Sequence, residues 1–184
     1  MNILLIIIGI VFIGFLITVL ATYLYISNQG NCNIQIFGDG RSKFKIDELT
    51  KESATFSTLI RYKNVGSQNG TIVDLFPRHL LPQEQFDAVN VESWLFDKSM
   101  ERHDGYWEAI IVKKGLEGII QLNIKLTAKN GDIINTLENM VDMPVNLVYQ
   151  VVGRSWFDIY KERIIMYKEE VAEAVKASLE KEVN

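Results

Sequence analysis

The sequence predicts an all-β fold: an antiparallel β-sandwich of seven or eight strands, preceded by one transmembrane helix and followed by one long amphipathic C-terminal helix. Three observations support this. The stretch from Ile3 to Ile26 has no charged side chain, short runs of alternating polarity then follow between turn residues, and the last segment changes to helical spacing. We therefore expect an anchor with a short linker at 1–30, a sandwich at 31–153 and a helix at 154–184.

The uncharged stretch is long enough to cross a membrane. A helix rises ~1.5 Å per residue, so about 20 apolar residues span a hydrocarbon core ~30 Å thick. A cleaved signal peptide is the alternative, but it has a basic start and a shorter apolar core. Met1 and Asn2 carry no side-chain charge. We expect a retained, single-pass anchor that contacts the lipid bilayer from Ile3 to Ile26.

The side of the membrane is less clearly encoded. Arg41, Lys43 and Lys45 follow the span, and basic residues beside a span favour the cytoplasm. Acidic residues lie among them, however, at the outer limit of the distance over which this bias acts. One span at the N-terminal end most often exports the domain that follows. We expect an extracytoplasmic domain, with a cytoplasmic one as the alternative.

Composition limits the remaining domain. Cys32 is the only cysteine, so no disulfide can form within the chain and the fold must depend on its core. An intermolecular disulfide through Cys32 is the alternative to a free thiol. The formal net charge is −4, and no basic cluster stands beside aromatic residues, which argues against nucleic acid as a partner.

The clearest strand is at 118–128, followed by a turn signal. Asn130-Gly131 comes directly after this strand, and Asn69-Gly70 separates two other apolar runs, so we expect two β-hairpins. The apolar face of the strand consists of Ile120, Leu122, Ile124, Leu126 and Ala128.

Further strands are expected at 32–37, 56–64, 71–76, 89–97, 106–114 and 145–152. Their spacing is typical of a sandwich, and no alternation of strands and helices indicates a parallel sheet. The segment YKNVGSQNGTIVD at 62–74 resembles the second strand, turn and third strand of immunoglobulin-like accessory domains. This resemblance implies an immunoglobulin-like sandwich, although the lone cysteine departs from the Cys…Trp…Cys pattern.

The segment from Ser155 onward predicts one helix of about 28 residues, with Ser155 as its N-cap. At ~1.5 Å per residue it would extend about 40 Å, farther than a sandwich can cover. It could dock on its own domain, pair with a second copy or bind another protein. The apolar residues of its overhanging half are the predicted interface: Val171, Val175 and Leu179.

No pattern of residues indicates catalysis or a cofactor. The two histidines, His79 and His103, have no zinc-like spacing, and a metal site from His79, Glu84 and Asp87 is a weaker alternative than ordinary loop residues. Carboxylates around Asp104-Gly105 are typical of a solvated turn. We predict no catalytic residues, no metal ligands and no cofactor.

The segment FPRHLLPQEQFD at 76–87 is the best candidate for a binding loop, because loops on a rigid β scaffold often carry binding residues. The alternative is that its prolines protect a sheet edge from strand pairing. The predicted contact residues are Arg78, His79, Gln83 and Gln85 in this segment, with Tyr106 and Trp107 beyond the Asp104-Gly105 turn.

These features favour a single-pass, membrane-anchored, non-catalytic module for protein binding or envelope structure. Its expected partners are the bilayer and a protein, or a second copy, at the C-terminal helix. The alternative is a membrane-tethered small-ligand sensor or enzyme with a site on its loops.

Overall fold

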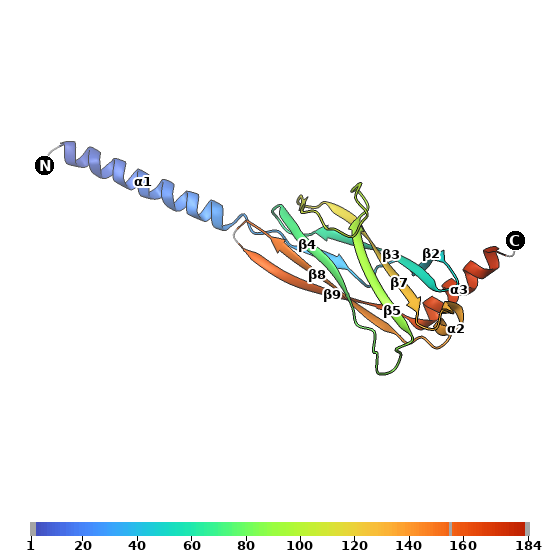
Figure 1. Cartoon of the computed structure of the whole chain (residues 1–184). Coiled ribbons are helices and arrows are strands. Elements are labelled where there is room, and N and C mark those ends of the chain that lie inside the picture. The colour runs from blue at the N-terminus through green and yellow to red at the C-terminus, as the bar shows by residue number, and fades with distance from the viewer. Residues whose placement is uncertain (1–2, 155, 183–184) are drawn as a thin grey trace.

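The computed structural model describes residues 3–154 and 156–182, so the predicted N-cap, Ser155, lies outside the described residues. Within them the chain forms nine strands in two antiparallel sheets. Three helices accompany the sheets: α1 (Ile3–Ser27), α2 (Ile133–Leu137) and α3 (Lys168–Glu182). Figure 1 shows α1 leaving one end of the β domain, with α2 and α3 at the other end.

Each sheet is built from strands that are not consecutive in sequence. One sheet has the order β1-β3-β7-β5, with β2 also paired to β3, and the other has the order β6-β4-β8-β9. The strands are β1 (Ile34–Phe37), β2 (Lys45–Leu49), β3 (Ser53–Asn64), β4 (Gly70–His79), β5 (Val89–Asp97), β6 (Ile110–Val112), β7 (Glu117–Ala128), β8 (Met143–Val152) and β9 (Phe157–Met166).

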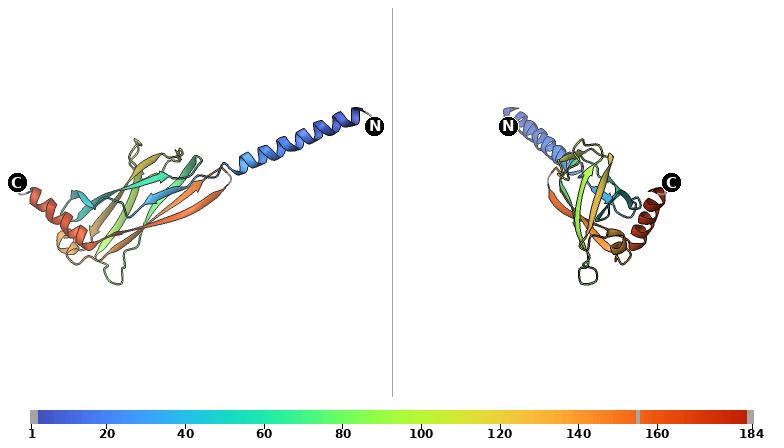
Figure 2. Two further views of the ribbon diagram at one scale, coloured as in Figure 1. Left: turned by 180° about the vertical axis from the view of Figure 1, so that it is seen from behind. Right: turned by 45° about the vertical axis from the view of Figure 1, so that its right-hand side comes forward.

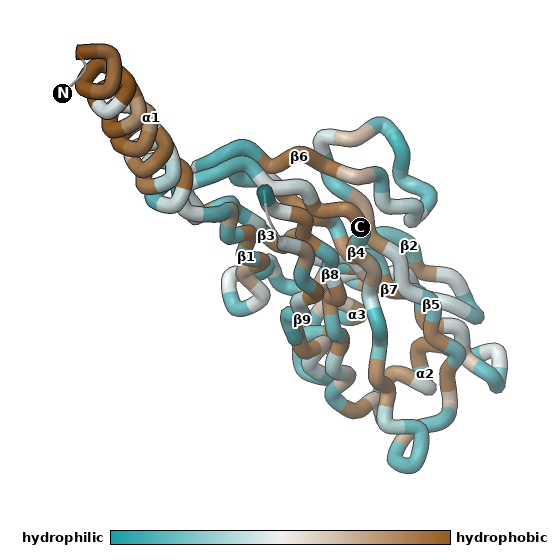
Figure 3. The backbone as a smooth tube through the Cα atoms, turned by 90° about the vertical axis from the view of Figure 1, so that its left-hand side faces the viewer, coloured by the Kyte–Doolittle hydropathy of each residue, from teal (hydrophilic) through white to brown (hydrophobic). Residues whose placement is uncertain are grey.

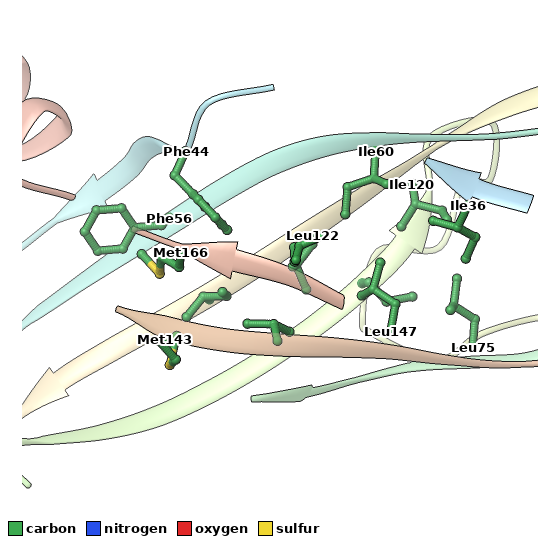
Figure 4. Close-up of a cluster of buried hydrophobic side chains, with 14 of the residues drawn as sticks. Ile36, Phe44, Phe56, Ile60, Leu75, Ile120, Leu122, Met143, Leu147 and Met166 are labelled. Carbon is green, nitrogen blue, oxygen red and sulfur yellow. The ribbon is translucent and has the colours of Figure 1, made fainter. Parts of the chain in front are cut away.

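The core lies between the two sheets, and alternating strand residues fill it. The predicted apolar face of β7 is confirmed, since all five of its residues are buried. Figure 4 shows Leu122 of β7 and Ile60 of β3 facing Leu147 of β8. Burying apolar surface contributes about 25 cal/mol per Å², so this continuous core holds the sheets together without a disulfide.

Both hairpin predictions are wrong. Asn69-Gly70 connects β3 to β4 in the opposite sheet, and Asn130-Gly131 leads into α2. Gly70 does not adopt a positive φ. A Cβ at Gly70 would lie 2.5 Å from the Cys32 Sγ, so this glycine is required by close packing and not by a turn.

The long C-terminal helix is also corrected. Residues 157–166 form β9, which pairs with β8 along its whole length, and the helix begins only at Lys168. Tyr160 and Ile164 are four residues apart, a spacing that fits both one face of a helix and one face of a strand, because four is also a multiple of the strand period of two. The strand was concealed by Glu162, a charged residue whose Oε1 accepts a hydrogen bond from the Gly38 N–H at 3.2 Å.

α1 is long and apolar enough to cross a membrane, and none of its side chains is buried against the domain. Figure 3 shows it as an almost continuously hydrophobic tube. The two views of Figure 2 agree that it projects away from the sheets. A core helix of a water-soluble domain would have a buried face, which α1 does not have.

The fully buried Asn64 side chain holds the junction between α1 and the sandwich. Its Oδ1 accepts hydrogen bonds from the N–H groups of Asn33 (3.1 Å) and Gly66 (3.0 Å). Its Nδ2 donates to the carbonyl oxygens of Gln68 (2.8 Å) and Val112 (2.9 Å). One amide therefore joins the segment after α1, the β3–β4 turn and β6.

Replacing Asn64 by Ala should lower the free energy of unfolding by about 3 kcal/mol, because four backbone groups lose their partner and some stay buried. Urea unfolding of the full chain in detergent measures this. The control is Asn69→Ala, which removes a single exposed hydrogen bond to the Lys114 N–H. Equal losses in the two variants would contradict the role given to Asn64.

Candidate functional site

The short helix α2 is fixed by capping and by burial. Asp132 is its N-cap, and the side chain accepts a hydrogen bond from the Asn135 N–H at 3.2 Å. Such a cap satisfies a backbone donor that the first helical turn leaves unpaired. Ile133 and Leu137 are buried in the core. α2 is therefore held in place at the end of the domain opposite α1 (Figure 1).

Helix α3 docks on its own domain at its first turns. The Asp142 carboxylate accepts a hydrogen bond from the Lys168 N–H at 2.9 Å, at the start of the helix. Val171 is 0% exposed and belongs to the core, with Ala174 and Val175 packed against it. This answers one alternative: at least the first half of the helix covers its own sandwich.

Arg41 fastens α3 to the loop between β1 and β2. Its guanidinium donates to both carboxylate oxygens of Glu170, at 3.2 and 2.8 Å, and to the Ile165 carbonyl oxygen at 2.6 Å. The two charged side chains are only 9% and 16% exposed. A bidentate ion pair shielded from solvent fixes the relative orientation of the two side chains as well as their distance, so it holds α3 at one angle to the sandwich.

An apolar groove of about 620 Å³ opens between α2 and α3. Apolar side chains of both helices line it, together with three charged residues. The lining residues are Ile134, Leu137, Glu138, Ala172, Val175, Lys176, Leu179 and Glu180.

The three predicted interface residues of the helix therefore lie in two different environments. Val171 is inside the domain and out of reach of a partner. Val175 and Leu179 line the groove and are only partly buried. Sequence reasoning missed Ile134 and Leu137, because the short helix α2 has too few residues to show a helical period.

The predicted loop residues do not form one surface. His79 is the last residue of β4, and its Nδ1 lies 3.0 Å from the Ser93 Oγ of β5. Trp107 is 6% exposed and donates its indole N–H to the Ile72 carbonyl near the opposite end of β4. At ~3.3 Å per residue, His79 and Ile72 are about 20 Å apart along the strand. Arg78, Gln83, Gln85 and Tyr106 are exposed.

The acidic residues around the Asp104 turn have structural partners. Asp97 is buried, and it accepts hydrogen bonds from the Tyr62 hydroxyl at 2.6 Å and from the Ser99 N–H at 2.8 Å. Burial, followed by the Asp97 carboxylate, raises the pKa of Tyr62. The Arg102 guanidinium at 2.7 Å lowers the pKa of Asp104. These contacts stabilise the turn at the edge of the sandwich.

The structure does not arrange His79, Glu84 and Asp87, the alternative metal site, as metal ligands. Asp87 forms an ion pair with Lys129 at 2.6 Å, and the ring of His79 faces Ser93. Across residues 3–154 and 156–182, no three His, Cys, Asp or Glu side chains are grouped as metal ligands would be.

No protein-family model matches the chain, and no curated protein matches it in sequence. Among solved structures, the GAE domain of GGA2p from Saccharomyces cerevisiae is 11% identical, with a TM-score of 0.37 over 72% of this chain and 88% of that chain. The yeast GGA1 GAE domain is 8% identical, with a TM-score of 0.35 over 72% and 89%. A protein from Archaeoglobus fulgidus is 8% identical, with a TM-score of 0.30 over 72% and 93%. Sequence identities and TM-scores this low give no evidence about the function of this chain.

Replacing Arg41 by Met should lower the free energy of unfolding by about 2 kcal/mol, because the shielded Glu170 loses its partner. The matched control is Lys43→Met, whose ion pair with Glu173 joins two exposed side chains and should contribute little. Urea unfolding and limited proteolysis within α3 measure both. Unchanged stability and protection in the Arg41 variant would refute the role of this pair in docking α3.

Burial lowers the pKa of His79 from its ordinary value of 6.5. The folded state therefore keeps the ring neutral while the unfolded state takes up a proton as the pH falls. The stability that this ring contributes is present above 6.5 and is lost below it. Thermal unfolding between about pH 7.5 and about pH 5.5 should show this loss, and the His79→Gln variant should show a smaller one. An identical pH dependence in both proteins would count against the assignment.

Proposed function

We propose that this chain is a single-pass, membrane-anchored, non-catalytic module that binds a protein in the groove between α2 and α3. The β domain serves as a rigid body between the anchor and the groove. Its sheets have the orders β1-β3-β7-β5, with β2 also paired to β3, and β6-β4-β8-β9. Without β2 and β6, this order matches the constant-type immunoglobulin sandwich, which supports an immunoglobulin-like classification.

The position of the groove is the observation that carries this proposal. The groove lies between α2 and α3. These two helices lie at the end of the domain farthest from α1 (Figures 1 and 2). If α1 spans a bilayer, the groove faces away from that bilayer and is accessible to proteins in the adjoining compartment. Apolar grooves between helices commonly accept the apolar face of an amphipathic helix.

The charges near the groove favour a partner with basic flanks. Exposed acidic residues of α3 outnumber its basic ones in the described side chains, and Glu138 adds another carboxylate on the α2 side. We therefore propose an amphipathic segment whose apolar side chains enter the groove and whose Lys or Arg residues face its acidic surroundings. Complementary charge of this kind mainly increases the association rate and the specificity.

The test compares two substitutions on the same helix. Leu179→Lys places a charge in the groove, whereas Ala177→Lys adds the same charge on an exposed part of α3 that does not line the groove. Both proteins should remain folded. Photo-crosslinking from a probe at Glu138 in native membranes should capture a partner with the wild type and the Ala177 variant, and lose it with the Leu179 variant.

Loss in both variants, or in neither, would refute binding through the groove. Capture of a second copy of this chain instead of another protein would also contradict the proposal, because the groove would then be a self-association surface. The molecular mass of the crosslinked product distinguishes these cases.

We also propose that the domain is extracytoplasmic, and sidedness needs its own measurement. Cys32 is buried, and burial raises the pKa of its thiol, so it should not react while the domain is folded. Its burial also argues against an intermolecular disulfide. A cysteine introduced at the exposed Asn139 should react with an impermeant maleimide in intact cells. Reaction only after lysis would place the domain in the cytoplasm.

A further inference from the structure

Three connections form the end of the sandwich from which α1 leaves. They are the β3–β4, β6–β7 and β8–β9 connections. One hydrogen bond to a side chain and one between backbone groups join the first two. The Lys114 N–H donates to the Asn69 Oδ1 at 2.9 Å, and the Gly115 N–H donates to the Asn64 carbonyl oxygen at 3.0 Å. We call this surface, made of residues 63–71, 111–117, 152–154 and 156–158, the anchored end.

Large apolar side chains are exposed at the anchored end. Ile111 of β6 is 65% exposed and Phe157 of β9 is 56% exposed. Strand pairing aligns Ile111, Thr71, Val152 and Phe157 in one row across the outer face of the sheet. Val65 and Leu116 in the turns are also exposed. Figure 3 shows β6 as a hydrophobic segment of the tube. Exposed apolar residues grouped in this way mark an interaction surface.

The anchored end is positively charged, although the chain has a formal net charge of −4. Its segments contain four basic residues and two acidic ones. One acidic residue, Glu117, lies 3.7 Å from Lys63. Lys113, Lys114 and Arg154 are exposed. Basic and apolar side chains together are typical of surfaces that lie in the headgroup layer of a membrane.

The link to α1 is short and docked on the same surface. Only Asn28, Gln29 and Gly30 separate α1 from Asn31, whose carbonyl oxygen accepts hydrogen bonds from the N–H groups of Ser67 and Gln68 in the β3–β4 turn. The Gln29 carbonyl oxygen accepts a hydrogen bond from the Ser67 Oγ at 2.8 Å, and the Arg154 guanidinium donates to the Gln29 side chain. Three extended residues reach at most about 10 Å, so the anchored end cannot move far from the end of α1.

We propose that the anchored end lies on the lipid surface, with its basic residues on anionic headgroups and its apolar residues at the boundary of the acyl chains. This rests on the proposed function, in which α1 spans the bilayer. The occupant is a lipid surface because α1 continues directly into it and because the charge of the anchored end is opposite to that of anionic lipids. Docking there would hold the sandwich at a fixed angle to the membrane.

The test uses the full chain in lipid nanodiscs, with phosphatidylcholine alone or mixed with phosphatidylglycerol. An environment-sensitive dye is attached to a cysteine introduced by Ile111→Cys, and the matched control is Asn139→Cys at the opposite end of the domain. Cys32 stays buried and unlabelled. Lipids with brominated acyl chains should quench the dye at 111 and leave the dye at 139 unquenched. Phosphatidylglycerol should increase the quenching, and the double substitution Lys113→Glu, Lys114→Glu should abolish that increase.

Co-elution of the chain with the discs, measured on the same samples, separates the two claims. If the chain co-elutes but brominated lipids quench the dye at 111 no more than the dye at 139, docking is overturned and the anchor is left intact. A chain that does not co-elute would overturn the anchor and docking together. Quenching at 111 that is the same with and without phosphatidylglycerol would contradict the proposed role of the basic residues.

Discussion

The uncovered apolar surface of α1 is the constraint on which the arrangement of the molecule depends. Its 25 residues have no buried side chain, so the domain does nothing to shield them from water. In the proposed function, a bilayer removes this surface from water, and a helix satisfies its own backbone hydrogen bonds there. If α1 spans a bilayer, the direction in which it leaves the sandwich determines which end of the domain is near lipid and which end is remote from it.

The two ends of the sandwich differ in a way that fits this direction. The buried amide of Asn64 and the bonds to Gln29 join the first end to the anchor. The pair between Arg41 and Glu170 holds α3 at the other end. Long strands and a continuous core connect the two ends, so their relative position is fixed without a flexible linker. A binding groove at the remote end would therefore be presented at a defined height and angle.

The sequence was most informative where one period applied without interruption. The alternation in β7 predicted a strand with one buried face, and the uncharged length of the N-terminal stretch predicted the long apolar helix α1, because each pattern follows from one environment per face. It failed at β9, where inward-facing residues four apart fit a helix equally well and Glu162 interrupted the alternation. β2 was missed because its residues are mostly exposed and charged.

The candidate site was only half predictable for a related reason. Val175 and Leu179 could be chosen from helical spacing, but the facing wall of the groove belongs to α2, whose five residues have no readable period. The pairing of Arg41 with Glu170 spans 129 residues of sequence, and a single sequence does not encode which distant charges will meet. Trp107 shows the opposite error: an aromatic residue just after the Asp104-Gly105 turn suggested a contact surface and instead fills the core.

The most direct measurement of the central claim is alkaline carbonate extraction of membranes from cells that express the full chain. The account predicts that the chain stays in the membrane pellet, and that a variant with Ile13 and Leu16 both replaced by Lys is released to the supernatant. Release of the unaltered chain would contradict the account, because the anchor, the orientation of the groove and the lipid contacts all depend on α1 crossing the bilayer.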